Sequence, residues 1–293
     1  MKQAVGIVGV GGMGGGVATR LLTEGWPVIL WNRSDAALDA FAGREGVTIA
    51  ATPAEAAQSG LVISFVSNDA ALREVTANDG GIFAGLPKDG VHVSMSSVSP
   101  ELIVRLATAH KEAEQSLIGA PVFGRPEAAA NGLLWIAVSG PQQAVAKAEP
   151  MLKTVSRSLH HFGEAPEMAL KAKIAGNFLI ASAIESMSEA FAMLERSGAD
   201  PRIFHEMMSE TIFGSVIHQN YGRIILEESF TPPGFKLALG GKDVGLAMDM
   251  ATKARAQMPF GEILKARFDV AEAAGLGDVD WNAISLLLRR DAR

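Results

Sequence analysis

The start of the chain joins an apolar run to a glycine pattern that suits phosphate binding. Residues 5–14 read VGIVGVGGMG, so a G-x-G-x-x-G sequence stands between a predicted strand and a predicted helix. In such a turn the first glycine permits a tight bend, the second lets the backbone approach a pyrophosphate, and the third lets the helix pack closely on the strand. The helix N-terminus then faces the phosphates. We therefore predict a dinucleotide site that includes Gly9, Val10, Gly11, Gly12, Met13 and Gly14. The alternative is a glycine-rich loop that binds no nucleotide.

The end of the second predicted strand indicates which dinucleotide this site prefers. A helix over residues 13–24 and a strand over 28–31 lead to Asn32, Arg33 and Ser34, about twenty residues past the glycines. NAD-binding chains place a carboxylate there to accept from the ribose 2′-hydroxyl. This chain has no carboxylate at that point, and an arginine pairs well with a 2′-phosphate. We predict NADP(H) in preference to NAD(H), the alternative being that Arg33 is a solvated turn residue.

Composition excludes several other kinds of protein. The 293 residues are 48% hydrophobic and carry a net charge of −6, with no cysteine. Disulfides, thiolate nucleophiles and cysteine-zinc sites are therefore excluded, and the six histidines lack metal-site spacing, so we predict no metal. There is no block rich in lysine and arginine, and no apolar run as long as a membrane span. We expect a cytoplasmic protein with no nucleic-acid or membrane partner, and no signal peptide, because a strand begins within a few residues.

The first half of the chain alternates predicted strands and helices. Strands are expected at 61–66, 91–95 and 133–138, and helices at 53–59 and 99–114. This alternation is typical of a doubly wound parallel sheet, the Rossmann arrangement, whose ligands bind beyond the carboxyl ends of the strands. Besides the glycine turn, those ends carry Asn32, Arg33, Val66, Ser67, Ser96 and Ser97.

Past residue 163 the predicted strands stop and helical spacing continues. A long helix is expected over 167–197, followed by helices at 201–210, 215–228, 241–256, 259–274 and 280–290. We predict an α/β Rossmann domain over 1–163 and an all-helical substrate and dimerisation domain over 164–293. So many apolar helix faces favour a homodimer or homotetramer, by analogy with other all-α domains.

Five segments in order give the chain a family resemblance. The glycine turn is followed by MSSVSP at 95–100, GAPVFGR at 119–125, Lys173 with Asn177, and Phe235 with Lys242-Asp243. This order resembles the β-hydroxyacid dehydrogenase family, which includes 3-hydroxyisobutyrate dehydrogenase, and the resemblance spans nearly the whole chain. It implies that residues 95–100 lie beside the nicotinamide and that Lys242 reaches the cofactor. The implied roles are cofactor binding for Val66, Ser67 and Ser97, substrate binding for Ser96, Val122, Phe123, Gly124 and Arg125, and catalysis for Lys173 and Asn177.

The chemistry that the resemblance assigns to Lys173 has a physical reason. When hydride reaches a carbonyl carbon, the carbonyl oxygen must receive a proton. A cationic nicotinamide and a partly apolar wall lower the proton affinity of a lysine, which then acts as general acid in reduction and general base in oxidation. Asn177 follows four residues later on the same helix face, whereas Lys171 points elsewhere. The alternatives are that both lysines are surface charges and that Ser96 and Ser97 cap the helix before Pro100.

Two departures from the family pattern concern the substrate. Relatives that handle acids read A-P-V-S-G-G in this loop, where this chain has Phe123 for the serine and Arg125 for the last glycine. A phenyl ring cannot hydrogen-bond a carboxylate, whereas an arginine can bind one through two N–H groups. We therefore predict an NADP(H)-dependent oxidoreductase that acts on a carbonyl or β-hydroxyacid-type substrate in a pocket more apolar than usual.

Two further functions stay open at this point. Imine reductases share this architecture and often carry W-N-R-S/T after the second strand, as Trp31 to Ser34 do here, but they usually lack the lysine. A nucleotide-binding regulatory or scaffold protein without catalysis is the third possibility.

Overall fold

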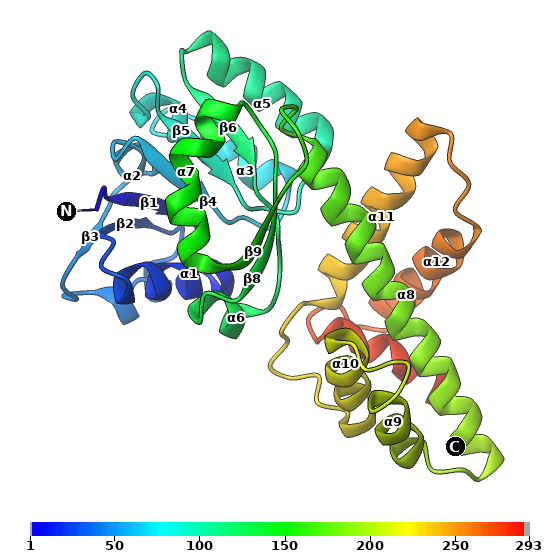
Figure 1. Ribbon diagram of the computed structural model, residues 1–293. Helices are drawn as coiled ribbons and strands as arrows, with labels where there is room; N and C mark the ends of the chain where they lie inside the picture. Colours follow the sequence, from blue (N-terminus) through cyan, green and yellow to red (C-terminus); the bar gives the residue numbers. More distant parts are fainter. Residues whose placement is uncertain (1, 290–293) are drawn as a thin grey trace. The chain divides into compact units, whose positions relative to one another are not determined.

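A computed structural model describes residues 2–289 of the chain (Figure 1). The chain forms two compact units, Met1–Lys173 and Ile174–Arg293. The sequence predicts the boundary after residue 163. The division falls later because the start of the long helix packs in the first unit, where Ala169 and Leu170 are fully buried.

The first unit is built on a six-stranded sheet in which all neighbouring strands are parallel. The strand order is β3-β2-β1-β4-β5-β6. The strands are β1 (Val5–Val8), β2 (Val28–Trp31), β3 (Val47–Ile49), β4 (Leu61–Ser64), β5 (Val91–Ser94) and β6 (Ser116–Gly119). The order reverses between β1 and β4, and at such a point ligands bind beyond the carboxyl ends of the strands. The predicted Rossmann sheet with a helical second part is confirmed.

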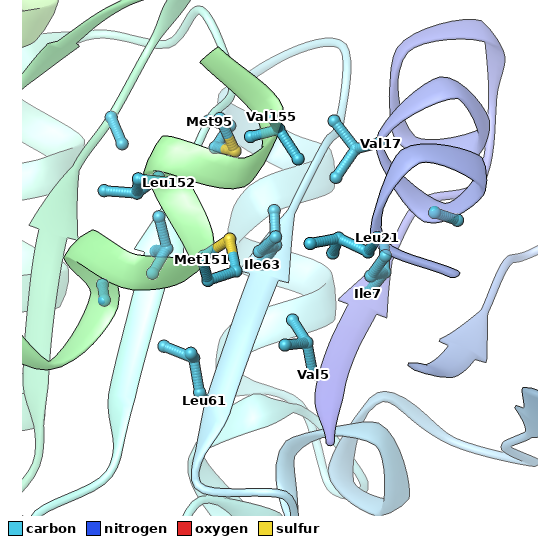
Figure 2. Packing of buried hydrophobic residues seen from close by; sticks show 14 of the residues in the cluster. Val5, Ile7, Val17, Leu21, Leu61, Ile63, Met95, Met151, Leu152 and Val155 are labelled. Atoms are coloured by element: carbon cyan, nitrogen blue, oxygen red, sulfur yellow. The ribbon is translucent and has the colours of Figure 1, made fainter. Parts of the chain in front are cut away.

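Helices cover both faces of this sheet. Figure 2 shows α1 (Gly12–Thr23) and α7 (Gln142–Val155) packing their apolar side chains on one face, against side chains of β1 and β4. The other face is covered by α2 (Pro53–Ala57), α3 (Asp69–Ala77), α4 (Ile82–Gly85) and α5 (Pro100–Glu112). Strands buried on both sides read as continuous apolar runs, which is why the sequence predicts them well.

A second, three-stranded sheet follows in the order β7-β8-β9. Here β7 (Val122–Phe123) runs antiparallel to β8 (Leu134–Val138), which pairs in parallel with β9 (Ser156–His161). The short helix α6 (Pro126–Ala130) connects β7 to β8. Neither β9 nor α7 is among the elements predicted from the sequence, and β9 is a polar and largely exposed strand without a hydrophobic signal.

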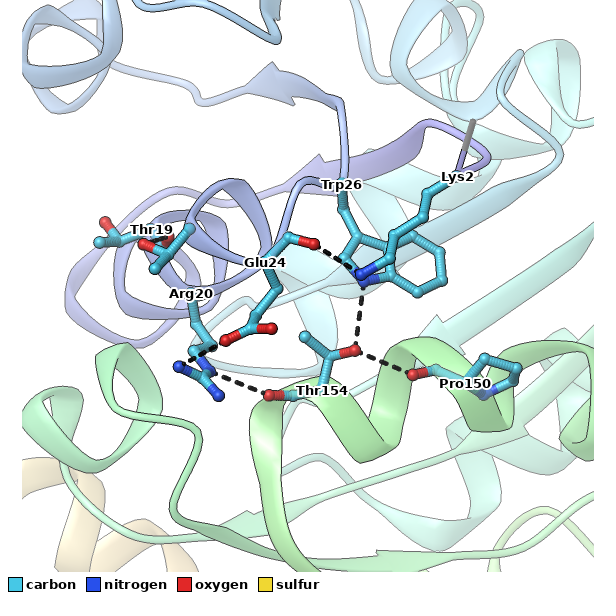
Figure 3. Close-up of polar contacts among 8 residues, drawn as sticks. Lys2, Thr19, Arg20, Glu24, Trp26, Pro150 and Thr154 are labelled. Carbon is cyan, nitrogen blue, oxygen red and sulfur yellow. Dashed lines mark hydrogen bonds and ion pairs between the residues drawn. The ribbon is translucent and has the colours of Figure 1, made fainter.

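Polar contacts tie α1 to α7 at the amino end of the sheet (Figure 3). The Arg20 Nε atom donates to the carbonyl oxygen of Thr154 at 3.2 Å, and the Trp26 indole donates to the Thr154 hydroxyl at 3.2 Å. Arg20 also pairs with Glu24, the C-cap residue of α1, at 2.9 Å. These contacts fix the two helices that cover one face of the sheet.

The long helix α8 (Met168–Ser197) leads into the second unit, whose described residues form helices and no strand. The helices are α9 (Pro201–Ser209), α10 (Val216–Glu227), α11 (Leu237–Ala254), α12 (Pro259–Ala273) and α13 (Leu286–Arg289). A 3-10 helix, Trp281–Ser285, precedes α13 where the sequence predicts one helix over 280–290. The last residue of that expected helix, residue 290, lies outside the described residues. Phe191, Phe268 and Trp281 fill the core. No helix among residues 2–289 is long and apolar enough to cross a membrane.

A chain of buried polar side chains links β4, β5 and α5 inside the first unit. The Ser64 hydroxyl lies 2.9 Å from His92 Nε2, His92 Nδ1 lies 3.0 Å from His110 Nε2, and His110 Nδ1 lies 2.9 Å from the side-chain oxygen of Gln115. Burial lowers the pKa of His92 well below its ordinary value and lowers the pKa of His110 to about 4. Both imidazoles are therefore neutral in the folded protein at neutral pH.

This histidine pair predicts a loss of stability in acid. Below pH 6.5 His110 becomes protonated in the unfolded chain, whereas in the folded protein it stays neutral until about pH 4. The free energy of unfolding therefore falls as the pH is lowered across this interval. His110 alone accounts for about 3 kcal/mol of this fall. Urea unfolding at a series of pH values measures it. His110→Gln removes the titrating ring and should flatten the curve relative to the wild type. Parallel curves for the two proteins would contradict the prediction.

Candidate active site

Each glycine of the first turn meets a different steric demand. Gly9 has φ +98°, and a Cβ there would lie 2.1 Å from the carbonyl oxygen of Phe65. A Cβ on Gly14 would lie 1.9 Å from the carbonyl oxygen of Gly9. A Cβ on Gly11 would meet nothing within 4 Å. Gly9 and Gly14 are therefore required by the protein itself, whereas Gly11 borders open space. This is the division of roles that a dinucleotide-binding turn needs.

The N-terminus of α1 suits an anion. Its N-cap residue is Gly11, whose lack of a side chain leaves the first helical amides without a side-chain cap, and its first turn holds no acidic residue. Unsatisfied amides at a helix N-terminus bind phosphate oxygens, and the helix dipole favours negative charge there. The chain segment from Gly9 to Gly14 thus fits the pyrophosphate of a dinucleotide.

Asn32 links the glycine turn to the end of β2. Its Oδ1 atom accepts from the backbone N–H of Val10 at 2.9 Å, and its Nδ2 atom donates to the carbonyl oxygen of Ser34 at 2.9 Å. Both polar ends of the Asn32 side chain are therefore engaged by backbone. Arg33 and Ser34 are exposed beside this link. Among the described residues, Arg33 has no hydrogen-bond or ion-pair partner.

The predicted residues after β4 and β5 are joined by a buried serine. The Ser96 hydroxyl accepts from the backbone N–H of Val66 at 2.9 Å and donates to the carbonyl oxygen of Ser64 at 3.2 Å. It therefore fixes the carboxyl ends of the two strands against each other. The helix that follows is capped by Ser99, which accepts from the backbone N–H of Leu102, so Ser96 and Ser97 are not its N-cap. Ser67 is exposed and Ser97 is half-buried.

The segment that resembles a substrate loop lies close to the glycine turn. Val122 and Phe123 form β7, and Gly124 turns the chain with φ +143°. Arg125 then precedes α6, which packs on α1 so closely that a Cβ on Gly16 would lie 2.8 Å from the carbonyl oxygen of Pro126. Packing of α6 on α1 therefore holds this segment beside the turn.

The start of α8 is fastened to the first unit and fixes Lys173. The Ser139 hydroxyl donates to the carbonyl oxygen of Pro166 and accepts from the backbone N–H of Ala169, each at 2.9 Å. One turn later, the Lys173 Nζ atom lies 4.1 Å from the centroid of the Phe123 ring, within cation–π range. The neighbouring Lys171 instead pairs with Glu167 at 3.4 Å. Of the two lysines, Lys173 thus meets the predicted substrate loop.

In the second unit a buried carboxylate joins two further predicted site residues. Asn177, on α8, donates from Nδ2 to Asp243 Oδ2, and Lys242 Nζ lies 3.1 Å from Asp243 Oδ1. Asp243 is only 2% exposed. From the sequence, Asp243 belongs to a motif but is not predicted as a site residue. The sequence signal that could have identified Asp243 is its helical spacing. Gly240 and Ala247 lie three residues before it and four after it, and they share its buried face on α11.

The predicted site residues therefore fall into two groups. The first unit holds the glycine turn, the ends of β2, β4 and β5, the Phe123 loop and Lys173. The second unit holds Asn177 and Lys242. Within residues 2–289 no group of three or more histidines, aspartates and glutamates is placed to hold a metal ion.

Comparison with known proteins identifies the family. Residues 4–163 match the family model described as the NAD binding domain of 6-phosphogluconate dehydrogenase. Residues 169–288 match the model described as NAD-binding of NADP-dependent 3-hydroxyisobutyrate dehydrogenase. The chain belongs to the β-hydroxyacid dehydrogenase family. It is accordingly a pyridine-nucleotide-dependent oxidoreductase, of a family whose members are named as dehydrogenases that act on hydroxyl groups.

Individual β-hydroxyacid dehydrogenase relatives match over almost the whole chain. The oxidoreductase YfjR of Bacillus subtilis is 38% identical over 281 residues, covering 96% of this chain and 98% of that protein. The L-threonate dehydrogenase of Cupriavidus necator is 27% identical and covers 97% of this chain and 95% of its own. The crystal structure of a 3-hydroxyisobutyrate dehydrogenase from Salmonella typhimurium has a TM-score of 0.89 at 25% identity, covering 97% of this chain and 99% of that one.

Imine reductases resemble this family member in fold. The structure of an imine reductase from Pseudomonas sp. has a TM-score of 0.63 at 19% identity, covering 97% of this chain and 98% of that one. At this identity the likeness concerns the fold alone, so the choice between a carbonyl and an imine substrate depends on the residues of the site.

The glycine turn gives a paired prediction. Gly14→Ala places a methyl group against the Gly9 carbonyl and should lower the free energy of unfolding by about 1–3 kcal/mol. Gly11→Ala meets open space, so its cost should be about 1 kcal/mol or less. Its methyl group would face the incoming pyrophosphate, and we expect NADPH to bind about tenfold more weakly or worse. Urea unfolding and a fluorescence titration measure the two effects. A Gly14→Ala protein as stable as the wild type would contradict this account.

Proposed function

We propose that this oxidoreductase transfers hydride between NADP(H) and a carbonyl or β-hydroxyacid-type substrate, with Lys173 as the general acid and base. The observation that supports it most is the position of the Lys173 ammonium, 4.1 Å from the ring of Phe123 on the loop beside the glycine turn. NADP(H), when bound, supplies or accepts the hydride. In the reducing direction Lys173 donates a proton to the substrate oxygen as the carbonyl π pair moves onto that oxygen. In the oxidising direction the neutral amine takes the proton back.

Asn177 is the second residue that we assign to catalysis. It is buried, and its side-chain amide donates to Asp243, which fixes the amide group. Held in this way, the amide keeps one orientation, from which it can orient the substrate and Lys173 together. Asp243 therefore acts through Asn177, as a residue that orients it.

The preference for NADP(H) is supported by the charges at the end of β2. Asn32 carries no charge, and its side-chain amide forms hydrogen bonds with the backbone of Val10 and Ser34. Arg33 is exposed and has no partner among the residues described, so its guanidinium is available to a 2′-phosphate. No carboxylate occurs from Trp31 to Ser34 to repel such a phosphate.

The substrate that we propose carries an apolar or bulky group, such as an aldehyde or keto acid larger than a semialdehyde. Phe123 offers a half-buried ring where acid-handling relatives have a hydroxyl, so one hydrogen-bond donor for a carboxylate is lost. A cyclic imine is the second candidate, favoured by Phe123 and by the W-N-R-S sequence at 31–34. Lys173 argues against it, because a proton-donating amine is what a carbonyl oxygen requires.

A homodimer or homotetramer is also proposed. In the second unit the single chain leaves large apolar side chains exposed, among them Leu179, Met193, Ile203, Met207 and Ile212. Apolar exposure of this extent is typical of a surface that another protein covers.

The role of Lys173 predicts the outcome of one activity experiment. NADPH oxidation is followed with a panel of aldehydes, keto acids and cyclic imines. On the best carbonyl substrate, Lys173→Ala should lower kcat/KM by about 10²- to 10⁴-fold, because the proton donor is lost. The matched control is Lys171→Ala, two residues away on the same helix, which should leave kcat/KM unchanged because Lys171 pairs with Glu167.

Other outcomes of that experiment select the alternatives. Turnover of imines that survives Lys173→Ala would establish an imine reductase and leave Lys173 without a catalytic role. NADPH binding with no turnover of any compound would favour a regulatory protein. Small semialdehydes as the best substrates would overturn the apolar pocket while leaving Lys173 in place.

The cofactor preference gives a second prediction. Arg33→Ala should weaken NADPH binding by about 10- to 100-fold, the loss of a charge-assisted contact, and leave NADH binding nearly unchanged. Fluorescence titration of both cofactors measures this. Arg105→Ala removes an exposed arginine from α5 and controls for net charge. If Arg33→Ala weakens the binding of NADPH and NADH equally, the guanidinium does not contact the 2′-phosphate.

A further inference from the structure

We propose that Phe123 is a positioning residue, whose ring holds the Lys173 ammonium in place through a cation–π contact. This inference rests on the proposed catalytic role of Lys173 and deepens it. It gives Phe123 a role beyond shaping an apolar pocket. The Lys173 Nζ atom lies 4.1 Å from the ring centroid, well within the range of about 6 Å over which a ring attracts a cation.

The ring and the ammonium are each anchored independently within Met1–Lys173. Phe123 pairs with Trp135 across the β7–β8 ladder, and the chain after it turns at Gly124 into α6, which packs on α1. Lys173 stands on α8, whose first turn is held by Ser139 and by close packing of Pro166 against Gly119. Their contact is therefore a consequence of two fixed backbones.

A ring suits the proton-transfer role of this lysine. A lysine side chain is flexible, and ordering it costs conformational entropy, so a proton donor gains from a fixed partner. A carboxylate partner would occupy an N–H group with a strong hydrogen bond. A phenyl ring has no acceptor lone pair, so it attracts the ammonium without accepting such a hydrogen bond from it.

The contact also favours the protonated form of Lys173, because the ring face attracts the ammonium and not the neutral amine. The charged residues nearest in sequence are Glu167 and Lys171, which pair with each other, and Arg125, two residues after Phe123. None of these charges changes when Phe123 is replaced, so a Phe123 variant isolates the effect of the ring.

The test is a titration of Lys173 itself. Lysines are reductively methylated with ¹³C-formaldehyde and their NMR signals are followed with pH, the Lys173 signal being assigned with Lys173→Arg. In Phe123→Leu the midpoint of that signal should fall by roughly 0.5 to 1 pH unit relative to the wild type, because the ammonium loses the ring. Phe123→Tyr keeps the ring and should titrate like the wild type. Phe123→Met, also without a ring, replaces the leucine variant if circular dichroism shows that the latter is unfolded.

Activity provides a second readout. The pH profile of kcat/KM for alcohol oxidation should move down by the same interval in Phe123→Leu and stay in place in Phe123→Tyr. Identical NMR midpoints in the wild type and in the ring-free variants would overturn the proposal. Because the NMR titration does not depend on turnover, it separates this result from a failure of the proposed function. If the proposed function is wrong, Lys173→Ala keeps full activity, whatever midpoints the titration gives.

Discussion

The site in the first unit depends on one steric constraint, which is that three positions of the glycine turn and α1 have no room for a Cβ atom. At Gly9 and Gly14 a methyl group would overlap a backbone carbonyl, and at Gly16 it would overlap α6. Removing these atoms lets α1 begin directly against β1 and β4, so its N-terminal amides reach the carboxyl edge of the sheet. The same closeness brings α6, and with it the loop of Phe123, to the phosphate-binding turn.

A second set of close contacts transmits this geometry to Lys173. Gly119, at the end of β6, would place a Cβ 2.3 Å from the carbonyl oxygen of Pro166, and Ser139 bonds to both sides of the start of α8. The helix therefore cannot slide along the sheet edge. Lys173 lies one turn into this helix, so the position of its backbone is fixed and the remaining freedom is that of its side chain. The ring of Phe123 lies 4.1 Å from the Lys173 Nζ atom, the contact from which we propose its positioning role.

The parts of the fold that could be predicted from the sequence are those whose signal is local. The buried strands read as apolar runs, the glycine turn follows one of them, and α8 shows helical spacing over thirty residues. All three features can therefore be recognised from the order of the residues alone. The strand β9 was missed because its residues are polar, and it exists only by pairing with β8. The contact of Phe123 with Lys173 joins residues far apart in sequence and depends on the packing of α6 and α8. The partnership of Asn177 with Asp243 likewise depends on two helices, α8 and α11, that meet only in the fold.

The two lysines of α8 show why a motif needs its structural context. Lys171 and Lys173 lie two positions apart, and their residue type alone does not distinguish them. On the helix they face different surroundings. Lys171 meets the carboxylate of Glu167, just before the helix begins, while Lys173 meets an aromatic ring on a separate strand. Lys171 forms an ion pair with Glu167 at the surface, as i,i+4 pairs do, and so donates to a carboxylate oxygen. The ring attracts Lys173 without competing for its protons. Of the two amines, therefore, Lys173 is the one whose aromatic partner accepts no hydrogen bond through a lone pair, which suits the proton-transfer role proposed for it.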